Sequence, residues 1–108
     1  MSPVSYDRLR RGSRSRLAER IRVCWEDDRG NPFEIKGRCV DISETGVAFL
    51  VEEPLPLRSY VQCEIASMRF KASGSIRFAY RKGLKHLIGL EFSGGQHWNP
   101  ETHPIPEV

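Results

Sequence analysis

The sequence predicts an all-β domain, a six-stranded antiparallel β-barrel with an irregular arginine-rich N-terminal arm and a short non-helical C-terminal tail. Three observations predict it. Apolar and polar residues alternate in several short runs between residues 21 and 92, as in strands with one buried face. Clusters of turn-forming residues separate these runs. Short strands at this spacing are typical of a barrel or sandwich, and closing a barrel removes exposed strand edges.

The chain of 108 residues fits one compact domain. We expect an arm over residues 1–20, a barrel over 21–93 and a proline-containing tail over 94–108. The apolar fraction of 39% and the charged fraction of 29% are ordinary for a globular protein. Because the N-terminus has no signal-peptide pattern and no apolar run approaches a bilayer span, we expect a cytoplasmic protein that does not bind a membrane.

The first strands are expected to form a hairpin. Apolar residues occupy the odd positions of residues 21–26, and the turn formers of residues 27–32 close that strand. The chain then returns through residues 33–42. Because the apolar phase of this second strand shifts around Gly37, we expect a bulge or a barrel corner there.

The remaining strands follow in order after a tight connection over residues 43–46. Residues 47–51 form a short apolar strand, and residues 61–65 alternate again. The longest alternation runs over residues 70–80, where the even positions from Phe70 to Tyr80 are expected to face the core. Residues 88–92 form the last strand.

The aromatic residues outside the long strand have different expected roles. Trp25 and Phe49 follow the apolar phase of their strands, so we predict that both belong to the core. Trp98 lies beyond the last strand and could order the tail by capping the barrel end or a partner surface. Three prolines between residues 100 and 106 exclude a long helix in this tail.

The sequence offers no metal or catalytic motif. The three cysteines form no CxxC pair and lie within predicted strands, so we expect buried free thiols. No histidine stands near another histidine or a cysteine at zinc-site spacing, so we predict no metal and no cofactor. No nucleophile motif is present either, and we expect no enzymatic activity.

The positive charge is concentrated in the arm. Residues 1–22 contain seven arginines and no lysine, against Asp7 and Glu19, which gives this segment a net charge of +5. The remaining ten basic and twelve acidic side chains give −2, so the arm accounts for the overall +3. An anionic partner is the natural inference. The planar guanidinium of arginine can form two parallel hydrogen bonds and can stack on an aromatic ring, which lysine cannot. These contacts suit a ligand with both phosphates and bases.

Two motifs stand apart from the strand pattern. Arg10 and Arg14 form an RxxxR spacing, and residues 41–46 read Asp-Ile-Ser-Glu-Thr-Gly, a DxSxxG spacing at a strand end. Neither is specific alone. The arginines could be a solvated arm, and Asp41 and Ser43 could simply satisfy the backbone groups of a turn.

Together and in this order, the motifs resemble those of the PilZ family of cyclic di-GMP receptors. The similarity extends to residues 47–50 and 88–92, and runs from about Arg10 to Phe92. The resemblance implies a PilZ-like barrel and a bacterial second-messenger receptor without catalytic activity. It also implies that the signal passes to an unidentified downstream protein. Many members end in a helix that covers one barrel opening, and the prolines of this tail depart from that pattern.

The resemblance implies a ligand site whose chemistry is reasonable for each residue. An arginine fork can grip guanine O6 and N7, while another arginine meets a phosphate or stacks on a base. Asp41 can accept from guanine N–H groups or orient an arginine, and Ser43 adds a short hydroxyl. Gly46 is expected to turn at positive φ and let the backbone approach the ligand. The predicted ligand-binding residues are Arg10, Arg11, Arg14, Asp41, Ser43 and Gly46.

Further expectations concern assembly and alternatives. The arm is expected to be mobile when free and to fold over cyclic di-GMP. In the family that the chain resembles, the residue immediately before the RxxxR motif influences whether one ligand molecule or a pair is bound. Leu9 stands at that position and supplies no extra guanidinium, so the resemblance implies one ligand per chain. We expect a monomer or weak homodimer. The main alternative is a PilZ-like interaction module that binds no nucleotide. A barrel that binds nucleic acid polymers is disfavoured, because the polar face of the long strand carries no aromatic residue and the barrel is net acidic.

Overall fold

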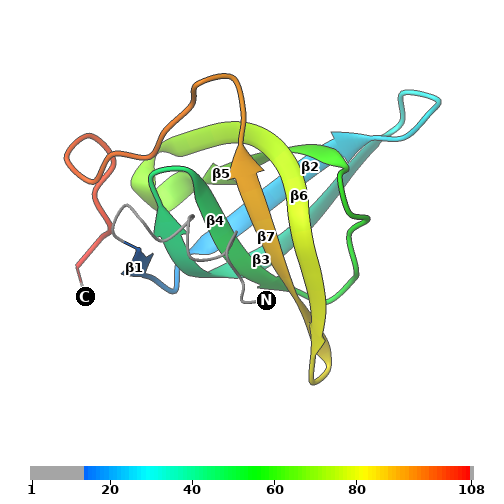
Figure 1. Cartoon of the computed structure of the whole chain (residues 1–108), viewed down its shortest axis with the longest axis horizontal. Coiled ribbons are helices and arrows are strands. Elements are labelled where there is room, and N and C mark those ends of the chain that lie inside the picture. The colour runs from blue at the N-terminus through cyan, green and yellow to red at the C-terminus, as the bar shows by residue number, and fades with distance from the viewer. Residues whose placement is uncertain (1–13, 108) are drawn as a thin grey trace, which may run out of the picture.

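The computed structural model describes residues 14–107 of the chain (Figure 1). These residues form seven strands and one short 3₁₀ helix, η1. Their bounds are β1 Ser15–Arg16, β2 Arg20–Glu26, β3 Pro32–Ser43, β4 Gly46–Val51, β5 Tyr60–Ile65, η1 Ala66–Met68, β6 Phe70–Lys82 and β7 Lys85–Phe92. No helix within residues 14–107 has the length and hydropathy needed to cross a bilayer.

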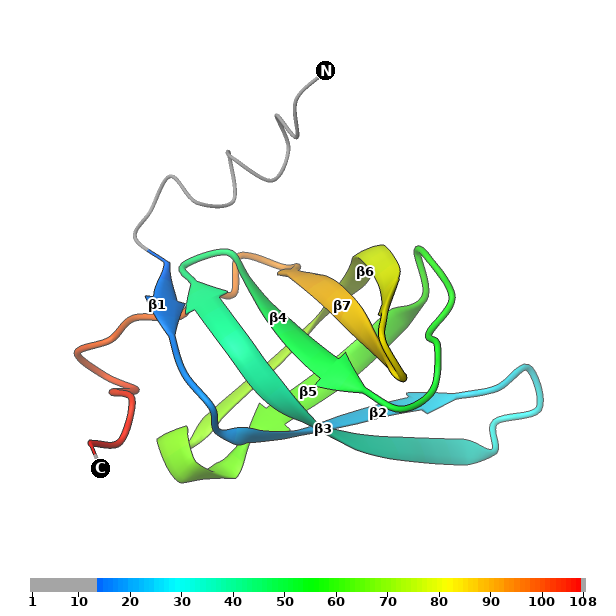
Figure 2. The same cartoon turned by 90° about the horizontal axis from the view of Figure 1, so that it is seen from below.

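The strands β2 to β7 close into an antiparallel barrel. The order is β3-β2-β5-β6-β7-β4, and a further pairing of β3 with β4 completes the ring, while β1 adds an outer strand to β3 (Figures 1 and 2). The predicted six-stranded barrel is confirmed, and no α-helix occurs among the described residues. The residues of the arm nearest the barrel are not irregular, because they contribute β1.

Strand β3 turns the corner that closes the barrel. Its first half pairs with β2 as far as Arg38, where pairing with β4 begins. A Cβ added at Gly37 would lie 2.3 Å from the carbonyl oxygen of Leu50, so only glycine allows this close crossing. The predicted corner is confirmed at Gly37, whereas the bulge lies further along, between Cys39 and Asp41.

A second bulge interrupts the expected alternation of buried and exposed residues in β6. The even positions are buried as predicted up to Ile76, but the register shifts between Ile76 and Phe78. The bulge exchanges the two faces of the strand, so Ala79 packs against the core and Tyr80 is 61% exposed. The prediction that Phe78 and Tyr80 face the core is therefore wrong.

The barrel interior is filled by the inward residues of all six strands. Phe49 is fully buried as predicted, whereas Trp25 only partly packs against the core and stacks on Phe33. The three cysteines are free, and Cys39 and Cys63 are buried. Burial raises the pKa of both thiols to about 12, so they behave as small apolar core residues.

The C-terminal tail covers one end of the barrel without forming a helix. Trp98 is buried, and its indole Nε1 donates to the carbonyl of His103 at 2.9 Å. The His103 ring lies edge-on to Phe70, with Nδ1 3.2 Å from the carbonyl oxygen of Met68. The backbone N–H of Trp98 donates to the carbonyl of Glu44 at 2.9 Å, so the tail contacts the turn between β3 and β4 directly.

Candidate functional site

The bulge in β3 determines which way Asp41 points. Cys39 pairs with Phe49 and faces the core, so a regular strand would also turn Asp41 inward. The extra residue, Val40, shifts the register, and Asp41 pairs instead with Ala48. The carboxylate consequently reaches the outer surface of the barrel.

The end of the arm is fixed beside this part of β3. In β1, Ser15 pairs with Ile42 and Arg16 with Asp41. The N–H of Leu17 donates to the carbonyl of Val40 at 3.2 Å, and the Leu17 side chain packs against the core. This segment of the arm is therefore paired with the barrel, and the expectation that the arm is mobile when free of ligand stays a prediction. The predicted contacts of Arg10 and Arg11 lie outside the described residues.

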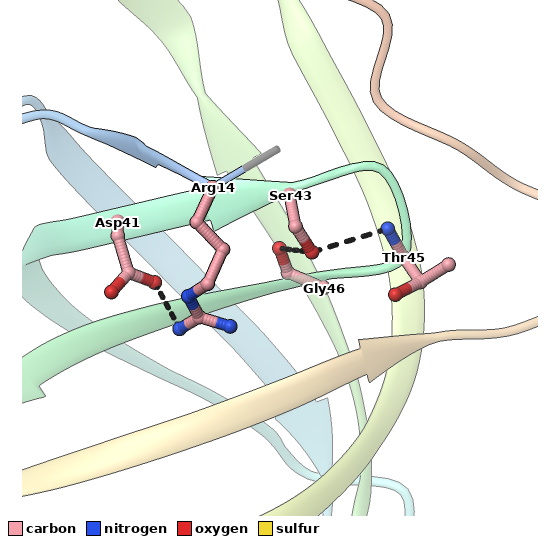
Figure 3. A network of polar contacts seen from close by, with 5 residues as sticks. All are labelled: Arg14, Asp41, Ser43, Thr45 and Gly46. Atoms are coloured by element: carbon pink, nitrogen blue, oxygen red, sulfur yellow. Dashed lines mark hydrogen bonds and ion pairs between the residues drawn. The ribbon is translucent and has the colours of Figure 1, made fainter. Parts of the chain in front are cut away.

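Arg14, just before β1, meets Asp41 across the strand (Figure 3). Its Nη2 donates to Asp41 Oδ1 at 2.5 Å, and the two side chains are only 11% and 17% exposed. Limited exposure reduces screening by water and salt, so the attraction exceeds that of an ordinary surface pair. The structure thus brings together one arginine of the RxxxR motif and the aspartate of the DxSxxG motif.

Ser43 organises the turn that follows Asp41. Its hydroxyl donates to the carbonyl of Gly46 and accepts from the N–H of Thr45, both at 3.4 Å (Figure 3). Only 1% of Ser43 is exposed. Both contacts are long for hydrogen bonds, but they occupy the hydroxyl in the turn. A direct contact between Ser43 and a ligand stays a prediction.

Gly46 begins β4 for a reason other than the one predicted. It is absent from the described residues with positive φ, so the expected left-handed turn is wrong. A Cβ at this position would instead lie 2.6 Å from the carbonyl oxygen of Leu90 on β7. The missing side chain lets β4 and β7 approach each other, and this places the turn against the neighbouring strand.

A row of strand partners extends from Asp41 across the outer face of the barrel. Asp41 pairs with Ala48 on β4, Ala48 with Gly89 on β7, and Gly89 with Phe78 on β6. A Cβ at Gly89 would come within 2.1 Å of the Phe78 ring, so this ring lies over the glycine. It also stacks on Tyr80, with ring centroids 5.3 Å apart. This row, the Asp41–Phe78 row, therefore runs from a carboxylate to an aromatic pair.

Sequence reasoning missed Phe78 because it continued the alternation of β6 through the bulge. A second charged pair lies on the same face: Arg77 Nε contacts Glu91 Oε1, and Glu91 is the strand partner of Gly46. Within the described range, no group of three metal-ligating side chains is present.

Comparison with known proteins identifies the family. The model of the PilZ domain matches residues 8–97, a range that includes both motifs and all seven strands. A comparison with curated protein sequences gave no match. The PilZ domain is known as a cyclic di-GMP receptor domain, and the family is one of binding and adaptor domains rather than enzymes. On the match and the closed barrel that carries both motifs, the chain belongs to the PilZ domain family.

Proposed function

We propose that this protein is a cyclic di-GMP receptor whose ligand lies on the outer face of β3 and β4, beneath the N-terminal arm. The observation that carries the proposal is the Arg14–Asp41 pair, which joins the two motifs in a PilZ domain. The pair fixes one guanidinium at one end of the Asp41–Phe78 row. Such fixed groups lose little conformational entropy when a ligand binds.

In this proposal Asp41 has two roles. Its Oδ1 accepts from Arg14 and orients that guanidinium, and the carboxylate has further lone pairs that suit guanine N–H donors. Arg14 presents a planar fork that matches the O6 and N7 acceptors of guanine. Arg10 and Arg11 supply the contacts to the phosphates or the second base, as charge-assisted hydrogen bonds or by stacking.

The Asp41–Phe78 row offers contacts to a planar base. Its two middle residues, Ala48 and Gly89, are small, and the Phe78 ring at its far end offers a stacking surface. Asp41 and Phe78 are separated by three strand spacings, about 14 Å in total. A dinucleotide with two guanines can therefore contact the Arg14–Asp41 ion pair and the Phe78–Tyr80 ring pair at the same time. Ser43 and Gly46 support this surface by holding the turn against β7.

The turn also links the site to the tail. Because Glu44 accepts a hydrogen bond from Trp98, a shift of the turn on ligand binding would reach the tail that covers the barrel end. We infer that a cytoplasmic partner protein reads this change, and that the chain itself catalyses no reaction. One ligand per chain is expected.

Calorimetric titration with cyclic di-GMP tests the proposal. Saturable binding by the wild-type chain that is weakened about 10- to 100-fold in Arg14→Ala and clearly reduced in Asp41→Asn would support it. The control is Arg22→Ala, because Arg22 is an exposed arginine of β2 whose partner is Glu64 of β5. Absence of binding to wild-type protein with intact secondary structure would refute the proposal and favour an interaction module that binds no nucleotide.

A further inference from the structure

The β2–β3 hairpin extends beyond the barrel wall. Pairing between β2 and β5 stops at Cys24 and Gln62, whereas pairing between β2 and β3 continues to Glu26 and Pro32. The end of the hairpin consequently leaves β5 and projects away from β1 in both views (Figures 1 and 2). This separation creates space between the hairpin and the start of β5.

A groove of about 660 Å³ occupies that space, and three of its lining residues are aromatic. Trp25 and Phe33 stack with ring centroids 5.7 Å apart and an interplanar angle of 14°. Phe33 is 47% exposed, and Tyr60 on the opposite side is 58% exposed. Exposed aromatic side chains around one groove are typical of protein interaction surfaces.

These rings are held in place by the fold. Trp25 packs against the core, and the stacked Phe33 is fixed by its strand pairing with Trp25. The hydroxyl of Tyr60 forms a hydrogen bond with Ser93 Oγ at 3.0 Å. Rigid aromatic groups lose little conformational entropy on binding, so they make efficient anchors.

The hairpin is strongly acidic. Residues 26–34 carry four acidic side chains and one basic side chain, a net charge of −3. Glu26 and Glu34 line the groove itself. Glu34 lies 3.8 Å from Arg22, whereas Glu26 is exposed and forms no ion pair with any residue of the described range. The charge of the groove therefore favours a cationic occupant.

The geometry points to a docking site for an extended basic segment of a partner protein, in which an arginine side chain stacks on the Trp25–Phe33 rings and pairs with Glu26. Arginine suits the site better than lysine, because its planar guanidinium combines stacking on a ring with a forked contact to a carboxylate. The groove shares no residue with the proposed nucleotide site, so the inference stands independently of nucleotide binding.

A matched pair of short fluorescein-labelled peptides provides the test. The first is an extended basic peptide with a central arginine, and the second carries glutamate at that position. Fluorescence anisotropy should show binding of the arginine peptide alone, with affinity reduced about tenfold or more in Phe33→Ala and in Glu26→Lys. The control, Leu84→Ala, removes an 88% exposed apolar side chain from the turn between β6 and β7 and should bind as the wild type does.

Amide and indole chemical shifts should locate the arginine peptide at Trp25, Phe33 and Gln62. Equal affinity for the two peptides, equal affinity of the wild type and both groove variants, or shifts confined to another surface would each overturn the inference. Sedimentation tests for a different occupant of the groove. Concentration-dependent dimers that Phe33→Ala abolishes would show that a second copy of the chain fills the groove, and this result would also overturn the inference.

Discussion

The Arg14–Asp41 pair can be tested by a double-mutant cycle with Arg14→Ala, Asp41→Ala and the double variant. Each single change leaves the other ionic group largely enclosed, since the side chains are only 11% and 17% exposed. The double variant removes both charges together. The loss of stability in the two single variants should therefore exceed, when added, the loss in the double variant.

The burial of the pair sets the size of the effect. A solvent-exposed pair couples by up to about 1 kcal/mol, whereas removing one partner of a fully buried pair costs about 3–5 kcal/mol. The Arg14–Asp41 pair lies between these limits, with one short hydrogen bond between charged groups. We therefore expect a coupling free energy of about 1–2 kcal/mol in unfolding. In ligand binding, the loss of a fork on guanine in Arg14→Ala predicts about 10- to 100-fold weaker affinity.

Urea unfolding of the four proteins gives the coupling directly, provided that the slope of the free energy with denaturant stays constant. Titration with cyclic di-GMP on the same samples gives the second cycle. Additive stabilities, within about 0.3 kcal/mol, would show that the contact contributes nothing to the fold. Unchanged ligand affinity in both single variants would refute the assignment of the site.

Three further predictions follow from other contacts. Gly46→Ala forces a Cβ to within 2.6 Å of a β7 carbonyl, so thermal unfolding should reveal a loss of about 1–3 kcal/mol. Phe78→Ala should weaken cyclic di-GMP binding about fivefold or more in calorimetry, while Leu84→Ala, at an 88% exposed position, should not. Because the pKa values of Cys39 and Cys63 rise from 9.0 to about 12 on folding, the fold retains protons that the unfolded chain releases in this range. The free energy of unfolding in urea should therefore be insensitive to these thiols below pH 9.0. As the pH rises towards about 12, it should fall by up to about 1.4 kcal/mol per pH unit for each thiol. Cys39→Val and Cys63→Val should each flatten this dependence, and an unchanged slope would contradict the reasoning.

The barrel could be predicted because alternation reports directly which face of a strand is buried. Val23, Phe49 and Ile76 all obey it, and the strand at Gly37 turns the predicted corner. Bulges are harder to predict, because a single extra residue is defined by the register of the partner strand, which the sequence of one strand does not contain. For this reason Phe78 was placed on the wrong face.

The motifs indicate which residues form the candidate site, but not the local structure of these residues. The structure brings Asp41 to the surface beside Arg14, and the bulge that directs it there was not expected at Val40. Gly46 was expected to adopt positive φ, but glycine is required at this position because β7 approaches it closely. A contact between strands that are distant in the chain leaves no signal in the sequence around the glycine. A glycine that a turn requires and a glycine that close strand packing requires therefore look alike in the sequence.

In our proposal, the arginines of the arm have two roles. Asp41 neutralises much of the net charge of Arg14, so this side chain offers directed hydrogen bonds rather than long-range attraction. In our proposal, Arg10 and Arg11 supply the long-range attraction of the anionic ligand. Directed contacts in a partly enclosed site resist screening by salt, whereas long-range attraction does not. In the same proposal, the pairing of β1 with β3 serves recognition, because it fixes Arg14, whose geometry rather than its charge has to match the base.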